Sequence, residues 1–123
     1  MDIRKTPAAK LNPAAYNPRK DLKPGDAEYE KLRRSIEEFG YVEPIIWNSR
    51  TGNIVGGHQR YKVLVSEGAT EIDCVVVHIE NPQEEKALNI ALNKAVGEWE
   101  PVALADLLSD LQQSGYDLGA TGF

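Results

Sequence analysis

Residues 54–61, with the sequence IVGGHQRY, carry the strongest local signal in this chain. The first two residues are β-branched and predict a strand, while the apolar residues from Tyr61 onward recur at helical spacing. Gly56 and Gly57 let the main chain bend sharply between the two elements. A helix leaves its first amide hydrogens without partners, and its dipole favours an anion there. The stretch therefore predicts a strand, a glycine turn and a helix that can bind a phosphate group.

Three side chains follow the glycine pair. Arg60 could give an anion a bidentate charged contact, and His58 and Gln59 could hydrogen-bond a sugar, a base or a phosphate. Two other interpretations stay open: the glycines could only make a tight turn, and Arg60 could only pair with an acidic neighbour. No metal site is expected, because His58 has no second histidine or cysteine close to it in the sequence.

The residues before this stretch predict one helix and a hairpin. Asp26 can cap a helix that ends at Gly40. The expected apolar face of this helix consists of Tyr29, Leu32, Ile36 and Phe39. A cluster of turn-forming residues separates the β-rich runs 45–47 and 54–55, which predicts a hairpin. Because prolines interrupt the opening segment, we expect only a short strand near Ile3 and then an ordered loop.

The residues after the glycine turn predict a strand and two helices. Residues 72–79 form a short run rich in β-branched side chains, so we expect a central strand that is buried on both faces. Asn81 and Pro82 mark the start of the first helix, which should fray near Gly97. Its expected apolar stripe consists of Leu88, Ala91, Leu92 and Ala95. The second helix should begin near Pro101. Its leucine ridge consists of Leu104, Leu107, Leu108 and Leu111.

The order of these elements decides the fold class. Strands and helices mix without a regular strand-helix repeat, so the predicted class is α+β: a small mixed β-sheet covered by helices, with two C-terminal helices. The size and composition, 123 residues of which 41% are hydrophobic and 27% charged, are typical of one globular domain. We expect a core over residues 1–97. Residues 98–123 should add a helical extension and a linker or truncated end within the same compact unit.

Charge is distributed unevenly along the chain. The net charge of −5 argues against a surface that binds nucleic acid mainly by broad attraction. Residues 1–62 hold 12 lysines and arginines against 8 aspartates and glutamates, whereas residues 63–123 hold 2 against 11. An anion should therefore prefer the first half.

The sequence also indicates the cellular compartment. Cys74 is the single cysteine and has no disulfide partner. Neither a signal peptide nor an apolar stretch long enough to cross a bilayer is present. We therefore expect a cytoplasmic protein without membrane contact.

A series of motifs resembles, in order, the signature of the ParB/sulfiredoxin superfamily. These motifs are Tyr16-Asn17-Pro18-Arg19, Leu32, Ser35-Ile36, Phe39-Gly40, Pro44-Ile45 and Gly57-His58-Gln59-Arg60. The similarity continues through Ala91-Leu92-Asn93-Lys94, Trp99, Gly115-Tyr116-Asp117-Leu118 and Thr121-Gly122-Phe123. The second half resembles ParB-like N-terminal domains, also called ParB-like nuclease domains, of the type associated with DNA methyltransferases and phage proteins.

This resemblance implies a shared nucleotide pocket. The pocket holds CTP in partition ParB proteins, ATP in sulfiredoxin and a phosphoryl donor in related free serine kinases. The matching nucleotide-binding and phosphate-binding residues here are Gly56, Gly57, His58, Gln59 and Arg60, with Asn17 and Arg19 approaching from the first loop. The expected ligand is a nucleoside triphosphate, CTP or ATP, together with Mg²⁺.

Departures from the family pattern narrow this expectation. Sulfiredoxin has a cysteine nucleophile after the glycine pair, whereas this chain has His58, so sulfiredoxin activity is not expected. The partition box reads glycine, glutamate, arginine, arginine, and only Arg60 is retained after Gly57, which argues against CTP hydrolysis. Partition proteins continue into a helix-turn-helix region that does not fit in this chain. Contact with DNA is therefore expected only indirectly or through other domains.

Three functions follow from these observations. The first is a nucleotide-sensing module, in which a triphosphate closes residues 17–19 and the glycine turn around its phosphates and shifts an equilibrium between monomer and homodimer. The second is an enzyme, a phosphotransferase or a nuclease, with Glu43 or Glu71 as general base and His58 as a proton or charge partner. The third is a scaffold that docks a DNA methyltransferase or a phage protein through the leucine ridge.

Overall fold

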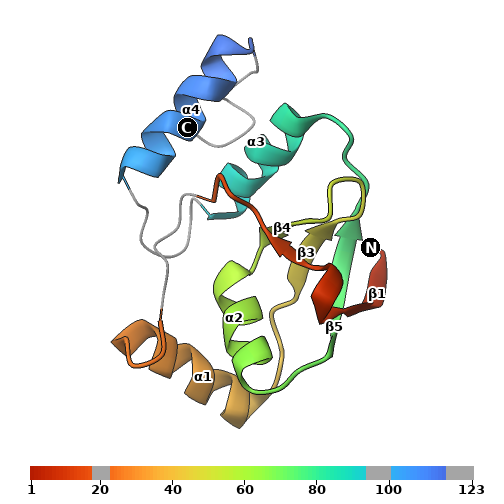
Figure 1. The fold of residues 1–123 in the computed structure, drawn as a ribbon, viewed down its shortest axis with the longest axis vertical. Helices are drawn as coiled ribbons and strands as arrows, with labels where there is room; N and C mark the ends of the chain where they lie inside the picture. Colours follow the sequence, from red (N-terminus) through yellow and green to blue (C-terminus); the bar gives the residue numbers. More distant parts are fainter. Residues whose placement is uncertain (18–22, 94–100, 116–123) are drawn as a thin grey trace.

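The structure, a computed structural model, describes residues 1–17, 23–93 and 101–115. Its elements are β1 (Ile3–Pro7), the 3₁₀ turn η1 (Ala8–Lys10), β2 (Asn12–Pro13), α1 (Ala27–Phe39), β3 (Ile45–Asn48), β4 (Asn53–Gly56), α2 (His58–Ser66), β5 (Glu71–Val77), α3 (Pro82–Asn93) and α4 (Pro101–Gln113) (Figure 1). Within these residues, every helix is too short or too polar to cross a membrane. The predicted α+β class, a small mixed sheet covered by helices, is confirmed.

The five strands form one mixed sheet in the order β1-β5-β3-β4-β2. β5 pairs antiparallel with β1 and parallel with β3. β3 pairs antiparallel with β4, which in turn pairs parallel with β2. The buried core against this sheet consists of Ala8, Leu11, Ile45, Ile54, Ile72 and Cys74.

β5 lies inside the sheet, as predicted, but the prediction that both of its faces are buried is wrong. Ile72 and Cys74 are buried, whereas Glu71 and Asp73 between them are exposed. Side chains of a strand alternate between the two faces of a sheet, so one face of β5 packs on the core, while the other is exposed at Glu71 and Asp73 and half-buried at Val75 and Val77.

The predicted hairpin is confirmed by β3 and β4. Ile46 lies opposite Gly56 and Trp47 lies opposite Ile54, so Val55 is an extra residue in β4. Such a β-bulge bends its strand and increases the local twist. The bend falls directly before Gly57 and so helps direct the chain from the sheet into α2.

α1 packs against α2 (Figure 1). The helix ends at Gly40, which has the positive φ of +82° that the sequence predicts. Tyr29 is buried against Val63 of α2. The predicted apolar face is wrong at Phe39, which is 66% exposed. The contact with α2 stops at Ile36, one turn before the end of the helix.

The start of α3 agrees with the sequence, but its buried face does not. The side chain of Asn81 accepts a hydrogen bond from the Gln83 amide at 2.9 Å, which confirms the predicted N-cap. Ala91 of the predicted stripe is exposed, and Leu88 and Leu92 are only half-buried. The fully buried positions of α3 are Glu85, Ala87, Asn89 and Ile90. Because two of these are polar, hydropathy placed the face incorrectly. Ala95 and Gly97 lie outside the described residues.

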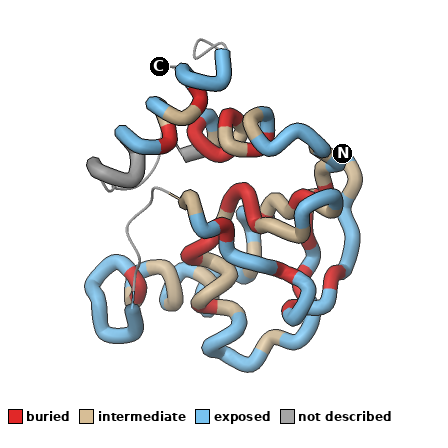
Figure 2. Tube along the Cα trace, turned by 45° about the horizontal axis from the view of Figure 1, so that its top comes forward, coloured by how far each residue is buried: buried red, intermediate tan, exposed pale blue. Residues whose placement is uncertain are grey.

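α4 packs on α3. Leu107 and Leu111 are buried against Ala87 and Ile90, and Figure 2 shows buried residues on both helices. Leu108 is half-buried in the same cluster, and the side chain of Leu104 lies outside the described part. Leu107 and Leu111 of the ridge are therefore occupied within one chain, which removes the basis for docking a partner through these two residues.

The first segment is more regular than the predicted loop. It contains η1 and the short strand β2, in which Asn12 and Pro13 pair with Asn53 and Ile54. β2 lies at the edge of the sheet, the position in which a strand tolerates proline. This pairing places the residues that follow Pro13 beside the end of β4.

Candidate functional site

The turn between β4 and α2 has the geometry that the sequence predicts. Gly57 has a left-handed φ of +87° and forms the N-cap of α2. Glycine has no side chain with which to cap this end, and the first turn of α2 contains no acidic residue. A Cβ added at Gly57 would lie 2.9 Å from Nη2 of Arg60 and 3.2 Å from Cα of Ile45. Both the backbone angle and the crowding therefore require glycine.

Gly56 lets α3 approach the end of β4. A Cβ added at Gly56 would lie 3.2 Å from Cδ1 of Leu92. Nearby, Asn89 Nδ2 donates a hydrogen bond to the carbonyl oxygen of Val55 at 2.9 Å. The glycine turn is thus held between the sheet and α3.

Arg60 lies in the first turn of α2 and reaches toward the segment before β3. Its Nη1 donates to Oε2 of Glu43 at 2.9 Å, and its Nη2 donates to the carbonyl oxygen of Pro44 at 3.3 Å. Among the described residues, nothing accepts a hydrogen bond from its buried Nε. The Arg60 side chain is only 20% exposed, whereas that of Glu43 is 73% exposed. An ion pair with so exposed a partner contributes about 0–1 kcal/mol, so an incoming anion could displace Glu43 at small cost.

His58 and Gln59 are both buried at the start of α2. Nε2 of His58 accepts a hydrogen bond from the Ala14 amide at 3.2 Å, so this nitrogen carries no proton in this arrangement. The imidazole fixes the first loop to α2. The structure therefore supports His58 as a residue that shapes the site, and the proton-transfer role stays a prediction.

Asn17 lies beside α3 and close to the glycine turn. Its amide donates to the carbonyl oxygen of Ala14 at 3.1 Å, and its Oδ1 accepts from Asn89 Nδ2 at 3.5 Å. Since the Ala14 amide donates to His58 and Asn89 donates to Val55, Asn17 is connected to both sides of the glycine turn through one intermediate residue each. Arg19 lies outside the described residues.

A buried carboxylate behind this loop was missed by the sequence analysis. Glu85 of α3 is 2% exposed and accepts hydrogen bonds from Tyr16 Oη at 2.7 Å, Asn48 Nδ2 at 2.7 Å, Asn53 Nδ2 at 3.1 Å and the Thr51 hydroxyl. Burial by itself raises the pKa of the Glu85 carboxyl, but these four hydrogen bonds outweigh it and hold the pKa below its usual value. The only sequence signal was its place in the first turn of α3, where an acidic residue is normally explained by the helix dipole.

Two hollows flank the loop and the turn. One, of about 310 Å³, lies between the end of α1, residues 40–43 and Arg60. The other, of about 330 Å³, lies between Tyr16, Lys86 of α3 and Asp110 of α4. Lys86 contacts Asp110 at 2.5 Å and lies 5.9 Å from the centre of the Tyr16 ring. The first hollow adjoins the predicted site directly through Arg60.

The three candidate catalytic residues are not gathered at one point. Glu43 contacts Arg60 of the turn, and His58 begins α2. Glu71 opens β5, three residues after Gly68 ends the turn that follows α2, so it lies toward the opposite end of that helix from Gly57 (Figure 1). Across the described ranges, no group of three or more histidine, cysteine, aspartate or glutamate side chains could hold a metal ion.

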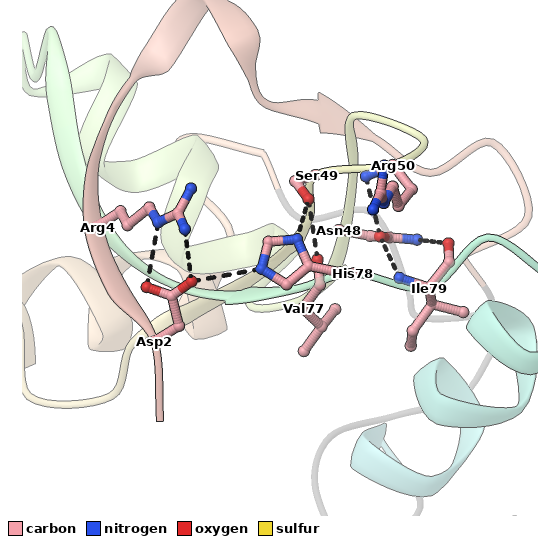
Figure 3. A network of polar contacts seen from close by, with 8 residues as sticks. All are labelled: Asp2, Arg4, Asn48, Ser49, Arg50, Val77, His78 and Ile79. Carbon is pink, nitrogen blue, oxygen red and sulfur yellow. Dashed lines mark hydrogen bonds and ion pairs between the residues drawn. The ribbon is translucent and has the colours of Figure 1, made fainter.

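A second polar network occupies the other edge of the sheet (Figure 3). Ser49 Oγ lies 2.6 Å from His78 Nδ1, and His78 Nε2 lies 3.4 Å from Oδ2 of Asp2. This order resembles a nucleophile, a base and an acid. However, Arg4 Nη2 lies 3.0 Å from the same Asp2 oxygen, and its Nε donates to the other at 3.1 Å. Since Asp2 is already neutralised by arginine, the network acts as a clasp that holds the first residues to the end of β5.

Comparison with known proteins identifies the family. The model of the family described as ParB N-terminal domain matches residues 1–96. The probable chromosome-partitioning protein ParB of Vibrio cholerae is 32% identical over 74 residues, which make up 58% of this chain and 25% of that protein. The chain thus spans about a quarter of the length of this curated relative.

Two solved structures share the fold at lower identity. The C-terminally truncated ParB of Caulobacter crescentus complexed with CTP-γ-S has a TM-score of 0.64 and 21% identity, over 88% of this chain and 63% of that one. The truncated Caulobacter protein complexed to the centromeric parS site has a TM-score of 0.63 and 16% identity, over 97% of this chain and 68% of that one. With the family match over most of its length, this chain belongs to the ParB N-terminal domain family.

Proposed function

We propose that this domain binds a nucleoside triphosphate, CTP or ATP, with its phosphates at the amino-terminal end of α2. The observation that carries the proposal is the start of this helix at Gly57, which has no side chain of its own to cap the helix and is followed by a first turn without an acidic residue. Helix amides and the helix dipole favour a phosphate at such an end. Arg60 supplies a positive charge in the first turn, and Asn17 lies on the neighbouring loop.

The surroundings suit the rest of a nucleotide. The 310 Å³ hollow beside Arg60 has side chains of Leu32, Ile36 and Tyr41 in its wall. A mostly apolar hollow with a few polar groups is typical of a site for a planar base or a sugar. The CTP-γ-S complex of the Caulobacter relative makes CTP the first ligand to test.

Magnesium would enter with the nucleotide. The described residues offer no carboxylate cluster near the turn, so the phosphates and water would supply most of its ligands. The bound state would differ from the present arrangement at one contact: Arg60 would leave Glu43 and turn to the phosphates.

Calorimetric titration with CTP, ATP and ADP in the presence of Mg²⁺ tests the proposal. Arg60→Ala should weaken binding by roughly 10-fold to 100-fold, because a charged contact to phosphate is lost. Glu43→Gln is the matched control, since it removes the competing carboxylate but keeps the size of the side chain. It should bind as tightly as the original protein, or about threefold more tightly.

The same pair of variants separates binding from catalysis. If Glu43 acted as a general base, Glu43→Gln would lose turnover of labelled nucleotide while retaining affinity. Absence of binding to all three nucleotides by the unaltered protein, or full affinity in Arg60→Ala, would reject the proposed site.

The setting of the domain is a proposal of the same kind. The parS complex of the Caulobacter relative supports a role near DNA. We expect that this domain does not bind DNA by itself and is connected to DNA only indirectly or through other domains. A homodimer is expected to respond to the nucleotide. Association with a DNA methyltransferase or a phage protein stays a prediction, since part of the motif set behind it lies in residues 94–100 and 116–123, outside the described ranges.

A further inference from the structure

We propose that Glu85 is a positioning residue for the nucleotide: by accepting a hydrogen bond from Tyr16, it holds Asn17 beside the start of α2. The inference rests on the proposed function, because it concerns the loop expected to approach the phosphates. Glu85 itself does not touch the ligand, since it is buried behind the loop.

The carboxylate accepts hydrogen bonds from four residues and so joins α3 to the hairpin and to the first loop. Its Oε1 accepts from Asn48 at the end of β3 and from Thr51 in the hairpin turn. Its Oε2 accepts from Asn53 at the start of β4 and from Tyr16 in the first loop. Three of these partners belong to the hairpin. Tyr16 is the partner that connects the carboxylate to the first loop.

Asn48 fixes the direction of this network. Its Oδ1 accepts the amides of Arg50 and Ile79, so its Nδ2 must be the group that donates to Glu85. The hairpin end is therefore rigidly connected to the carboxylate. A carboxylate that accepts four hydrogen bonds has its preferred orientation fixed and can hold a mobile group in one place.

The Tyr16 hydroxyl transmits this rigidity to the loop. Tyr16 directly precedes Asn17, whose amide closes a turn onto Ala14 at 3.1 Å. Ala14 in turn donates to His58 at 3.2 Å. Among the residues that the structure describes, the Asn17 side chain makes one long contact of 3.5 Å with Asn89, so these contacts fix its position mainly through the residues before it. Loss of the tyrosine hydroxyl should therefore loosen Asn17 while leaving the glycine turn unchanged.

Two variants that each remove one hydroxyl from the same carboxylate test this inference. Tyr16→Phe keeps the ring beneath Lys86 but removes the link to the loop. Thr51→Val removes the hydroxyl that donates to Glu85 from the hairpin and also the contact of that hydroxyl with the Asn53 amide. It should therefore destabilise the fold at least as much as Tyr16→Phe does. Only Tyr16→Phe should weaken binding of CTP with Mg²⁺, by roughly 5-fold to 10-fold, because fewer molecules hold the loop in the binding arrangement.

Amide hydrogen exchange without nucleotide provides an independent readout. The Ala14 and Asn17 amides should exchange faster in Tyr16→Phe than in Thr51→Val, whereas the amides in the middle of α2 should be equal in both. If the unaltered protein bound no nucleotide, the proposed function would fail, and exchange alone would still decide whether Glu85 positions the loop. Equal exchange at Ala14 and Asn17 in the two variants would overturn the inference, as would equal affinity in a protein that binds.

Discussion

Gly57 and Gly68 flank α2 and both have a positive φ, +87° and +93°, but their surroundings differ. No atom of the described residues lies within 4 Å of a Cβ added at Gly68, whereas one added at Gly57 would meet Arg60 and Ile45. At position 68, glycine is therefore needed only for its backbone conformation. At position 57, glycine is needed for its backbone conformation and also because β3 packs closely against the proposed phosphate site.

Replacement of these two glycines by alanine should separate the two requirements. Gly68→Ala should lower the free energy of unfolding by about 1–2 kcal/mol, the cost of a left-handed non-glycine residue. Gly57→Ala should cost about 1–3 kcal/mol more, because Ile45 must also move. Urea unfolding measures both. Nucleotide affinity should persist in Gly68→Ala and be lost in Gly57→Ala; equal stability and equal affinity in the two variants would contradict this account.

At the scale of elements, α3 shows where sequence patterns stop being informative. Its start could be predicted from Asn81 and Pro82, whose capping chemistry is local. Its buried face could not, because Glu85 and Asn89 are polar and are buried only through partners distant in the sequence. β2 was missed for a similar reason: a two-residue strand exists only through its pairing with β4. The glycine turn, the hairpin and the extent of α1 depend on local signals and were predicted correctly. The predicted cap of α1 is wrong, because the Asp26 side chain accepts a hydrogen bond from the Lys23 amide and none from the helix.

The Glu85 network makes a prediction about pH. The pKa of Glu85 lies below its ordinary value of 4.5 in the folded protein, so its contribution to stability is full above that pH. The contribution is lost as the pH falls through the lowered folded pKa. Each carboxylate oxygen faces an asparagine amide that can only donate, so the amide nitrogen of glutamine would meet a donor at either position. Glu85→Gln should therefore lower the free energy of unfolding at pH 7 by about 2–4 kcal/mol.

Urea unfolding at pH 7 and at about pH 3 checks the direction of this effect. The difference between the original protein and Glu85→Gln should narrow at the lower pH. Glu84→Gln, an exposed neighbour on the same helix turn, makes the same change of charge and should alter stability by less than about 0.5 kcal/mol at either pH. If the difference in the free energy of unfolding between the original protein and Glu85→Gln stayed constant or widened in acid, the ionised carboxylate of Glu85 would not be the stabilising form.

At the scale of the whole molecule, the proposed site and the clasp of Asp2, Arg4 and His78 lie toward opposite edges of the sheet. The site combines β4, the start of α2, the first loop and α3, while the clasp combines β1 and the end of β5. The turn and the first loop of the site both fall in the basic half of the sequence. Family membership could be recognised from the ordered motifs of the sequence. The polar network of Glu85 behind the first loop could be recognised only from the three-dimensional structure.

An NMR titration of the labelled protein with CTP and Mg²⁺ tests the phosphate site residue by residue. Saturable shifts of the backbone amides are expected at residues 57–60, accompanied by shifts at residues 14–17. The amides of Asp2, Arg4 and His78 should not move, which makes the clasp an internal control. Saturable shifts that leave residues 57–60 unchanged, or no shifts at millimolar nucleotide, would contradict a phosphate site at the start of α2.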